Sequence, residues 1–504
     1  MYSIKEISAR IWASLVHRQT QSWSKKPIKS QEKVFWSLIK AAEGTVFGVN
    51  HSFGSIKSIK DFQNQVPVRD YEELSPYVNQ VVDGEEDVLW PGKPKYFAKT
   101  SGTTSGSKYI PITSEMAIHQ IKSARNALLT HVQNTKNAKF LNGKMIFLQG
   151  SPVLEKTGSG IPTGRLSGIT AHFVPSYLQK NRMPSWKTNC IEDWEEKVVS
   201  IVEETHKSDM TLISGIPPWV QMYFEKLMEK TQKKNMSEVF PNFNLFVTGG
   251  VAFEPYKARF RELFGKEIPI LQTYPASEGF FAYQDQLDSS ELLLLLDNGI
   301  FYEFIPTENY FDESPPRLTI KDVKLGVNYA LIISTNAGLW GYSIGDTVIF
   351  VSLSPFRIKV SGRIKHFISA FGEHVIGSEV DYSMEKTVSH FGGRVREFTV
   401  APEISPPDGG LPYHEWFVAF DNPPEDLVSF AKELDLNLQK KNSYYHDLIQ
   451  GGVLRPCVVR RLPAEAFINY MKSEGKLGAQ NKVPRLMNDR KIANALTAAN
   501  PLSD

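Results

Sequence analysis

Cysteine is scarce in this chain, which holds only Cys190 and Cys457 among its 504 residues. The two thiols lie far apart in the sequence, and neither has a C-x-x-C partner or a histidine at the spacing of a zinc site. This excludes a framework of several disulfides and a structural zinc module. We therefore expect two buried thiols in a reducing compartment, which favours a cytoplasmic location.

An excess of charge of one sign is lacking as well. The chain has 57 Lys and Arg against 55 Asp and Glu, a formal net charge of +2 at pH 7 and an isoelectric point near 8.2. Neither nucleic acid nor an anionic membrane is therefore an expected partner.

Long hydrophobic runs are nearly absent. The one uncharged stretch of membrane-span length is "GVNYALIISTNAGLWGYSIG", residues 326–345. It contains two Asn, four Gly and a turn signal at 336–338, so two strands joined by a turn fit it better than a membrane span. The N-terminal "IWASLV" is too short for the core of a signal peptide. We expect a soluble protein.

The distribution of strand and helix patterns predicts two domains. The first 95 residues are helical, with "QEKVFWSLIKAAEGTVFG" as the clearest amphipathic piece, and a helix begins near Ser114. Its apolar face is expected to hold Ala117, Ile121, Ala124, Leu128 and Val132. From "KMIFLQ" (144–149) to "IPILQT" (268–273) strands alternate with helices, which indicates a parallel or mixed sheet.

Strands dominate residues 290–360, where the five-leucine run reads as a buried strand, and helices and strands mix again beyond Arg363. We predict an α/β fold in which residues 1–360 form a large N-terminal domain with mixed β-sheets and flanking helices. Residues 361–504 are expected to form a small α+β domain.

The stretch "TSGTTSGSK", residues 100–108, has no apolar side chain and lies between two predicted strands. Such a loop can turn backbone N–H groups and Lys108 towards one anion, for which a nucleotide phosphate is the obvious candidate. A flexible surface loop is the alternative. The stretch is not a P-loop, because Lys108 lies two residues beyond Gly106 and Tyr109 follows in place of Ser or Thr.

Three further polar stretches interrupt apolar strands. In "TYPASEGF" (273–280) Glu278 lies at the carboxyl end of a predicted strand, where a carboxylate can hold a Mg²⁺ that bridges ATP phosphates. The alternative is a loop glutamate beside Ser277 as a helix N-cap. In "YSIGD" (342–346) Asp346, expected between two strands, could accept ribose hydroxyls or close a turn. "SGRIKHFI" (361–368) places Arg363 and Lys365 at the domain boundary.

The order of these stretches resembles the adenylate-forming superfamily of acyl-CoA ligases, adenylation domains and luciferase. The pattern is the Ser/Thr/Gly-Lys loop, "GGVAFEP" (249–255), "YPASE", Y-x-x-G-D, G-R-x-K and "NKVPR". Within the superfamily the chain is similar to the auxin-responsive acyl acid amido synthetases, and most to their bacterial members. The resemblance runs from "TVFG" (45–48) to "KLGAQNKVPRL" (476–486).

The resemblance implies a role for each matching residue. The phosphates of ATP would be held by Ser101, Gly102, Thr103, Thr104, Ser105 and Lys108. Adenine would be walled by Gly250, Val251 and Tyr274. The α-phosphate would meet Ser277, the Mg²⁺ would meet Glu278, and the ribose would meet Asp346 and Arg363. Two lysines complete the set, Lys365 as a hinge and Lys482 as the lysine that enters the site during adenylation.

Three positions depart from the plant members. Ser343 and Ile344 stand where those members usually have Arg and Val, and His374 stands in a turn where some have Lys.

The implied activity is adenylation of a small carboxylic acid by ATP with Mg²⁺, followed by transfer of the acyl group to an amine such as an amino acid. A carboxylate needs this activation because its own leaving group would be oxide. An acyl-CoA ligase shares the first step and stays open, as does a nucleotide-binding protein without turnover. We expect a monomer.

Overall fold

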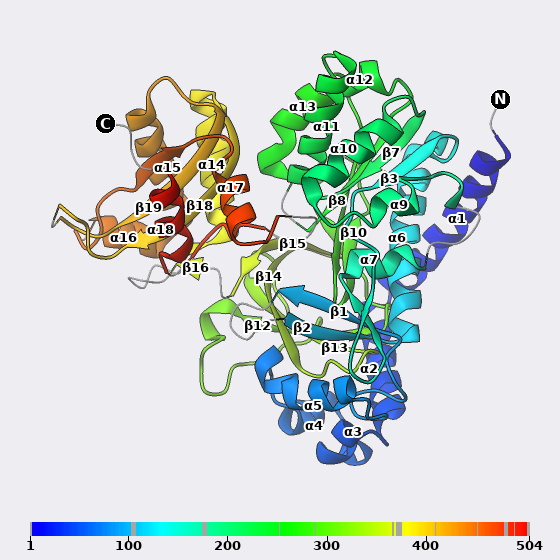
Figure 1. Ribbon diagram of the computed structural model, residues 1–504. Coiled ribbons are helices and arrows are strands. Elements are labelled where there is room, and N and C mark those ends of the chain that lie inside the picture. The colour runs from blue at the N-terminus through cyan, green and yellow to red at the C-terminus, as the bar shows by residue number, and fades with distance from the viewer. Residues whose placement is uncertain are drawn as a thin grey trace. The chain divides into compact units, whose positions relative to one another are not determined.

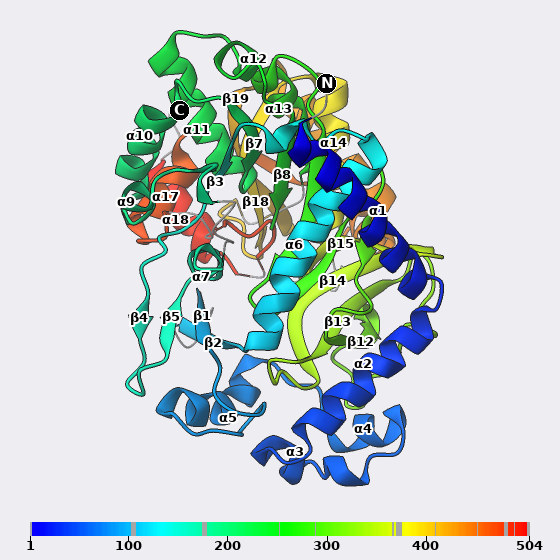
Figure 2. The same cartoon turned by 90° about the vertical axis from the view of Figure 1, so that its right-hand side faces the viewer.

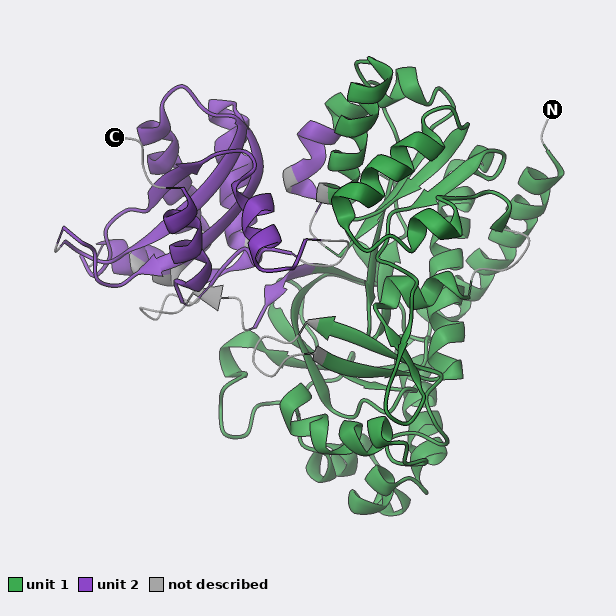
Figure 3. Ribbon diagram, viewed as in Figure 1, with its two compact units in different colours: residues 1–251, 261–359 green, residues 252–260, 360–504 purple. Residues whose placement is uncertain are grey.

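The computed structural model describes residues 3–101, 107–173, 179–250, 253–287, 289–364, 367–368, 375–408, 410–450, 452–477, 482–487 and 489–500. The chain forms two compact units (Figure 3): residues 1–251 and 261–359 make unit 1, and residues 252–260 and 360–504 make unit 2. The sequence predicts a domain boundary between residues 360 and 361, and the chain passes from unit 1 to unit 2 between residues 359 and 360. The inclusion of 252–260 in unit 2 has no counterpart in the sequence prediction.

Helices fill the N-terminal part of unit 1, as the sequence predicts. Capping boxes formed by Ser3 with Glu6 and by Asp70 with Glu73 fix the starts of two of them. The amphipathic stretch 31–48 covers two helices instead of one, because Thr45 caps a new helix. The elements are α1 (Ile4–Ser24), α2 (Pro27–Ala42), α3 (Val46–Asn50), η1 (Phe53–Ser55), α4 (Ile59–Gln65) and α5 (Tyr71–Asp83).

A mixed sheet forms the core of unit 1 (Figure 1). Within the described residues this sheet has 11 strands, in the order β12-β13-β14-β15-β11-β10-β9-β8-β7-β3-β6. The parallel part comprises β3 (Lys144–Phe147), β6 (Arg182–Met183), β7 (Met210–Ser214), β8 (Leu245–Gly249) and β9 (Ile270–Ala276). The antiparallel part comprises β10 (Gly279–Gln284), β11 (Leu292–Leu294), β12 (Ile300–Pro306), β13 (Asn328–Thr335), β14 (Tyr342–Leu353) and β15 (Phe356–Arg363).

Two sequence predictions about this sheet are confirmed. The uncharged stretch 326–345 forms β13, a turn and the start of β14, and the five-leucine run lies buried in and after β11. None of the helices in the described part of the chain is long and apolar enough to cross a membrane.

Helices and a second sheet flank the large sheet. Helix α6 (Ser114–Thr135) packs on β9 and β10, with α1 along its other side (Figure 2). Its buried face differs from the predicted one, since Ala124 is exposed while Gln120 and Ser123 are buried. The second sheet has the order β2-β1-β5-β4, with β1 (Tyr96–Ser101), β2 (Ser107–Ile112), β4 (Glu155–Lys156) and β5 (Pro162–Gly164). The remaining helices of this region are η2 (Lys139–Leu141), α7 (Leu166–Ala171), α9 (Trp186–Asn189), α10 (Trp194–Thr205), α11 (Pro217–Thr231), α12 (Met236–Val239) and η4 (Thr307–Asn309).

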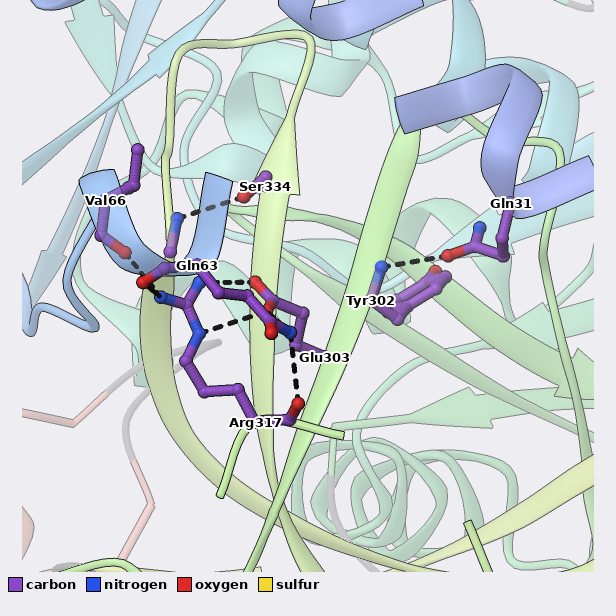
Figure 4. A network of polar contacts seen from close by, with 8 residues as sticks. Gln31, Gln63, Val66, Tyr302, Glu303, Arg317 and Ser334 are labelled. Atoms are coloured by element: carbon purple, nitrogen blue, oxygen red, sulfur yellow. Dashed lines mark hydrogen bonds and ion pairs between the residues drawn. The ribbon is translucent and has the colours of Figure 1, made fainter. Parts of the chain in front are cut away.

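A buried polar network joins the N-terminal helices to the sheet (Figure 4). The guanidinium of Arg317 donates to both carboxylate oxygens of Glu303 in β12, at 3.0 and 2.6 Å, and to the carbonyl of Gln63 in α4 at 3.1 Å. The Arg317 and Glu303 side chains are 8% and 0% exposed. Gln31 of α2 accepts from the Tyr302 N–H at 2.9 Å. The helices therefore have a fixed position on the sheet.

Unit 2 is the small α+β body that the sequence predicts. Its three-stranded sheet has the order β18-β19-β20, and β16 pairs with β17. The elements are η3 (Glu254–Tyr256), the first residues of α13 (Lys257–Phe264), β16 (Phe367–Ile368), β17 (Val375–Ile376), α14 (Gly377–Phe391), β18 (Arg394–Glu403), β19 (Tyr413–Asn422), α15 (Leu427–Lys441), α16 (Ser443–Gln450), β20 (Val458–Leu462), α17 (Ala466–Ser473) and α18 (Lys491–Ala499).

The two cysteines differ in burial. Cys457 is buried, as expected, and its burial raises the pKa of the thiol. Cys190 is only partly buried, so the expectation for this residue is wrong. Both thiols are free.

Candidate active site

The turn at Ser277 and Glu278 lies at the carboxyl end of β9. These two residues connect β9 to β10 as a tight hairpin, with Ala276 paired to Gly279. Ser277 is 8% exposed, and Glu278 is partly exposed. No helix begins at this turn, so Ser277 is not a helix N-cap. The carboxylate of Glu278 is therefore at the strand end where open α/β sheets bind ligands.

Helix α6 fixes this turn from one side. The side-chain amide of Gln120 donates to the carbonyl of Ala276 at 3.2 Å. Gly279 allows the close approach of β12, because a Cβ at this position would lie 2.5 Å from the Cδ1 of Ile300. The backbone of the turn is thus held on both sides.

Tyr274 and Asp346 meet through a hydrogen bond. The Tyr274 hydroxyl in β9 donates to Oδ2 of Asp346 in β14 at 2.6 Å. The two strands are four places apart in the sheet order, which in a flat sheet would separate them by roughly 19 Å. The sheet must therefore curl strongly, and β14 is visibly curved (Figures 1 and 2).

The position of Asp346 corrects a sequence prediction. Asp346 lies within the continuous strand β14 and not between two strands. Ala330 pairs with Thr347 and Ile332 with Ser343, so β14 has two extra residues between these pairs. Gly345 has φ +81°, a left-handed conformation that few other residues adopt without strain. Such a bulge redirects side chains, and here it accompanies the contact of Asp346 with Tyr274.

Lys108 lies in β2, on the far side of the loop predicted to hold phosphates. Its Nζ is 5.2 Å from the centre of the Tyr71 ring, at the start of α5. The Tyr71 hydroxyl accepts from the Tyr109 N–H at 2.8 Å. Ser101 and Ser107 pair at the ends of β1 and β2. The side chain of Ser101 and the residues Gly102, Thr103, Thr104 and Ser105 lie outside the described residues.

The ends of β8 and β9 lie side by side because these two strands are parallel. Gly250 follows β8 with φ +82°, and Val251 lies outside the described residues. At Gly249 a Cβ would approach the Thr273 carbonyl to 2.5 Å, so β8 and β9 need glycine there. The structure thus brings Gly250, Tyr274, Ser277 and Glu278 to one region of the sheet edge.

The residue Ser343, which departs from the plant pattern, has its own partners in this unit. Its hydroxyl accepts from the Tyr310 hydroxyl at 2.8 Å, and its N–H donates to the Arg69 carbonyl at 2.8 Å. Ser343 and Ile344 are 5% and 8% exposed. Both residues are therefore part of the packed interior at this position.

Two predicted site residues belong to unit 2. Arg363 is the last residue of β15, and Lys482 is an exposed residue before α18. The chain just after Lys482 is tied to β18: the Thr399 hydroxyl donates to the Pro484 carbonyl at 2.6 Å, and the Val400 N–H donates to the Arg485 carbonyl at 2.9 Å. Lys365 and His374 lie outside the described residues.

Sequence reasoning missed the partly buried cluster around Arg485, which follows Lys482 in the "NKVPR" motif. Arg485 pairs with Glu397 and, through Nε at 3.1 Å, with Asp381. Tyr256 donates to Glu397 at 3.3 Å, which ties segment 252–260 to the same cluster. Burial raises the pKa of Asp381 to about 6; the nearby Arg485 guanidinium opposes this rise, and the negative charge of Glu397 adds to it. The arginine in the motif was the only available signal.

Within the described residues, no three His, Cys, Asp or Glu side chains gather as ligands of a metal ion would. Any divalent ion at Glu278 would need most of its ligands from elsewhere. Substrate phosphates and water commonly supply them for Mg²⁺.

Family models decide the relationship of the chain. A GH3 family N-terminal domain matches residues 16–216, a GH3 family central domain matches residues 293–363, and a GH3 family C-terminal domain matches residues 378–491. The chain belongs to the GH3 family. The expected family resemblance is thereby confirmed.

Individual relatives of this GH3 chain are distant in sequence. The indole-3-acetic acid-amido synthetase GH3.3 of Arabidopsis thaliana is 21% identical over 92% of this chain and 90% of its own length. Among solved structures, the GH3.15 acyl acid amido synthetase has a TM-score of 0.79 at 14% identity, covering 98% of this chain and 97% of that one.

A 2-hydroxyisobutyryl-CoA ligase in the postadenylation state, in complex with R3-HIB-AMP, has a TM-score of 0.60 at 12% identity. That match covers 94% of this chain and 92% of the ligase. These likenesses show the fold: the chain folds like these two ligases, which confirms the predicted α/β fold class.

Proposed function

We propose that this protein is an ATP-dependent acyl acid amido synthetase. It would adenylate a small carboxylic acid, release pyrophosphate, and pass the acyl group to an amine such as an amino acid. The observation that carries the proposal is the Tyr274–Asp346 pair beside the Ser277–Glu278 turn, in a chain of the GH3 family. Its relative from Arabidopsis thaliana, named as an amido synthetase, matches along nearly the whole chain.

The nucleoside of ATP would lie between β8, β9 and β14. In this arrangement Gly250, Val251 and Tyr274 wall the adenine. Asp346 accepts hydrogen bonds from the ribose hydroxyls, with Arg363 behind it. Because Tyr274 donates to Oδ2 of Asp346, the carboxylate is already oriented before the nucleotide binds.

The phosphates would lie over the loop between β1 and β2, where the residues from Ser101 to Ser105 and Lys108 supply N–H, hydroxyl and ammonium donors. Ser277 would donate to the α-phosphate. Donors fixed in advance where charge develops are the main requirement for phosphoryl chemistry. Lys482 would add its charge during adenylation.

Glu278 fits a role as protein ligand of Mg²⁺. It offers a carboxylate oxygen, the ligand type that this ion prefers, and one or two protein carboxylates are enough when phosphates and water complete the shell. When bound, the ion would neutralise charge on the phosphates.

The proposal is tested by acid-dependent exchange of labelled pyrophosphate into ATP, across a panel of aromatic and aliphatic carboxylic acids. Exchange with at least one acid, and none without acid, supports adenylation. Failure of every acid in the presence of Mg²⁺ would favour a nucleotide-binding protein without turnover.

An acyl-CoA ligase shares the adenylation step, and this exchange does not distinguish the two. The acceptor of the acyl group, an amine or coenzyme A, decides between them.

A further inference from the structure

Three basic side chains surround residues 149–151, which follow β3. Arg165 precedes α7, and its Cδ would lie 3.1 Å from a Cβ placed on Gly150. Arg182 in β6 donates to the Ala171 carbonyl at 3.2 Å and also contacts the amide oxygen of Gln149.

Lys197 of α10 is connected to residues 149–151 by hydrogen bonds to the end of α9. Its Nζ donates to the Asn189 carbonyl at 2.6 Å, and the next carbonyl, that of Cys190, accepts from the Ser151 hydroxyl at 3.4 Å. Besides burial, which lowers the pKa of Lys197, two neighbouring groups act on it in opposite directions: Cys190 raises it and the positive charge of Arg165 lowers it. Helices α9 and α10 lie beside β3 (Figures 1 and 2). We call Arg165, Arg182 and Lys197 the basic cluster.

Among the described residues, no Asp or Glu forms an ion pair with any member of the basic cluster. Lys197 is only 1% exposed, and burial lowers its pKa to about 8. Burial also lowers the pKa of Arg182. Buried positive charges normally have an anionic partner, because an unpaired charge is costly to remove from water. The basic cluster therefore lacks its expected partner within the described chain.

Two buried polar atoms next to the basic cluster also lack partners in the described structure. They are the Nε of Arg182, a donor, and the Oδ1 of Asn189, an acceptor. Buried polar atoms are nearly always hydrogen-bonded. A ligand carboxylate would satisfy the Nε of Arg182, and the Oδ1 of Asn189 would need a donor elsewhere on the same ligand.

The basic cluster lies at the same sheet edge as the proposed nucleotide site. Strands β3, β7, β8 and β9 are parallel neighbours, so their carboxyl ends point the same way. Three strand spacings separate the end of β3 from that of β9, roughly 14 Å. Long basic side chains and a substrate a few atoms long can bridge much of this distance.

We propose that the basic cluster binds a carboxylate of a substrate that does not itself react. The inference rests on the proposed function, and two sources of the carboxylate are chemically equivalent. It belongs either to the amino acid acceptor or to a second acidic group on the acyl acid. Arg165 and Arg182 would donate to the carboxylate, and Lys197 would supply charge from behind them.

The test compares two variants, Arg165→Gln and Lys197→Met, with wild type. The matched control is Lys207→Met, which removes an exposed lysine just after α10. Each protein is assayed in acid-dependent pyrophosphate exchange without amine, and in amide formation. The amine is either the best amino acid acceptor or its carboxamide, which lacks the free carboxylate.

If the acceptor is the source, Arg165→Gln raises KM for the amino acid at least about tenfold, as for one lost charge-assisted hydrogen bond. Lys197→Met raises the same KM by a smaller factor, because it removes charge behind the arginines and no hydrogen bond to the substrate. Exchange and turnover with the carboxamide then stay as in wild type. If the acyl acid is the source, the KM for the acid in exchange rises instead. Unchanged KM values for both substrates in active, folded variants would overturn the basic cluster as a binding site.

A stability measurement separates binding from a structural role. Because Lys197→Met removes a buried charge without a carboxylate partner, its melting temperature should equal or exceed that of wild type. A lower melting temperature together with unchanged KM would assign Lys197 to packing. If wild type itself adenylates no acid, the proposed function fails, and the assignment of a substrate carboxylate to the basic cluster fails with it.

Discussion

At the scale of single residues, the hydrogen bond between Tyr274 and Asp346 suggests what the bulge in β14 is for. The bulge in β14 and the left-handed Gly345 accompany a carboxylate that Tyr274 holds at 2.6 Å. A carboxylate such as that of Asp346 accepts several hydrogen bonds at once, so its chemistry suits a ligand with two neighbouring hydroxyls. The ribose of ATP offers such a pair.

We therefore expect Asp346→Ala to raise KM for ATP at least about tenfold, the size of a lost hydrogen bond to a charged group. The same substitution should have little effect with 2′,3′-dideoxy-ATP, which lacks the hydroxyls. Exchange kinetics with both nucleotides, for wild type and variant, form a double-mutant cycle. Equal losses with both nucleotides would mean that Asp346 does not bind the ribose.

Glu278 is the second residue whose proposed role, binding of Mg²⁺, can be tested by one substitution. Glu278→Ala should reduce acid-dependent pyrophosphate release about a hundredfold or more, on the scale of one lost transition-state contact. Glu267→Ala, which removes a well-exposed carboxylate of the same unit, is the control. If the rate of pyrophosphate release of the Glu278 variant stays within a few-fold of the wild-type rate, Glu278 is only a residue of the β9–β10 turn and does not bind the metal.

At the scale of elements, the alternation of strands and helices was predictable, because period and turn signals are local. Residue-level burial was not. In α6 the sequence placed Ala124 in the apolar face, yet this residue is exposed and Gln120 is buried, because its amide serves the Ala276 carbonyl. A polar side chain is recognised as interior only when its partner is known.

The candidate site also has a part that the sequence predicts and a part that only the fold reveals. Glu278 and Tyr274 follow a predicted strand and could be placed from the sequence. The contact between Tyr274 and Asp346 could not be, since it needs the curl of the sheet across four strand positions. Nor could segment 252–260 be assigned to unit 2, because the Tyr256–Glu397 contact joins residues far apart in the chain.

The Arg317–Glu303 pair is expected to be the main electrostatic link between α4 and β12. Arg317→Met should lower the free energy of unfolding by about 3–5 kcal/mol, because it leaves Glu303 buried and unpaired by its arginine. Lys93→Met, which breaks an exposed pair with Glu86, should cost less than about 1 kcal/mol. Urea unfolding of both variants measures the difference. Similar losses of unfolding free energy in the two variants would show that the buried pair contributes no more to stability than the exposed pair.

At the scale of the whole molecule, the residues proposed to act on ATP belong to two compact units of the chain. Tyr274, Glu278 and Asp346 belong to unit 1, whereas Lys482 belongs to unit 2. A lysine on a separate domain can stabilise the transition state only when that domain closes over the site. The anchoring of residues 484–487 to β18 means that Lys482 moves as part of unit 2.

Lys482→Ala should therefore slow adenylate formation strongly and slow amide formation from a supplied acyl-AMP much less. The control is Lys476→Ala, an exposed lysine of unit 2 that pairs with Glu474. Single-turnover assays of each half-reaction give the two rates. Equal slowing of both steps would remove the main support for two conformations of the C-terminal domain.

The identity of the acceptor tests the central claim most directly. Wild-type protein is incubated with ATP, Mg²⁺ and an acid that supports exchange, together with either a mixture of amino acids or coenzyme A. AMP release is measured, and the products are identified by mass. The account predicts that amino acids accelerate AMP release and that an acyl–amino acid amide accumulates. Acceleration by coenzyme A alone, with a thioester as product, would contradict it.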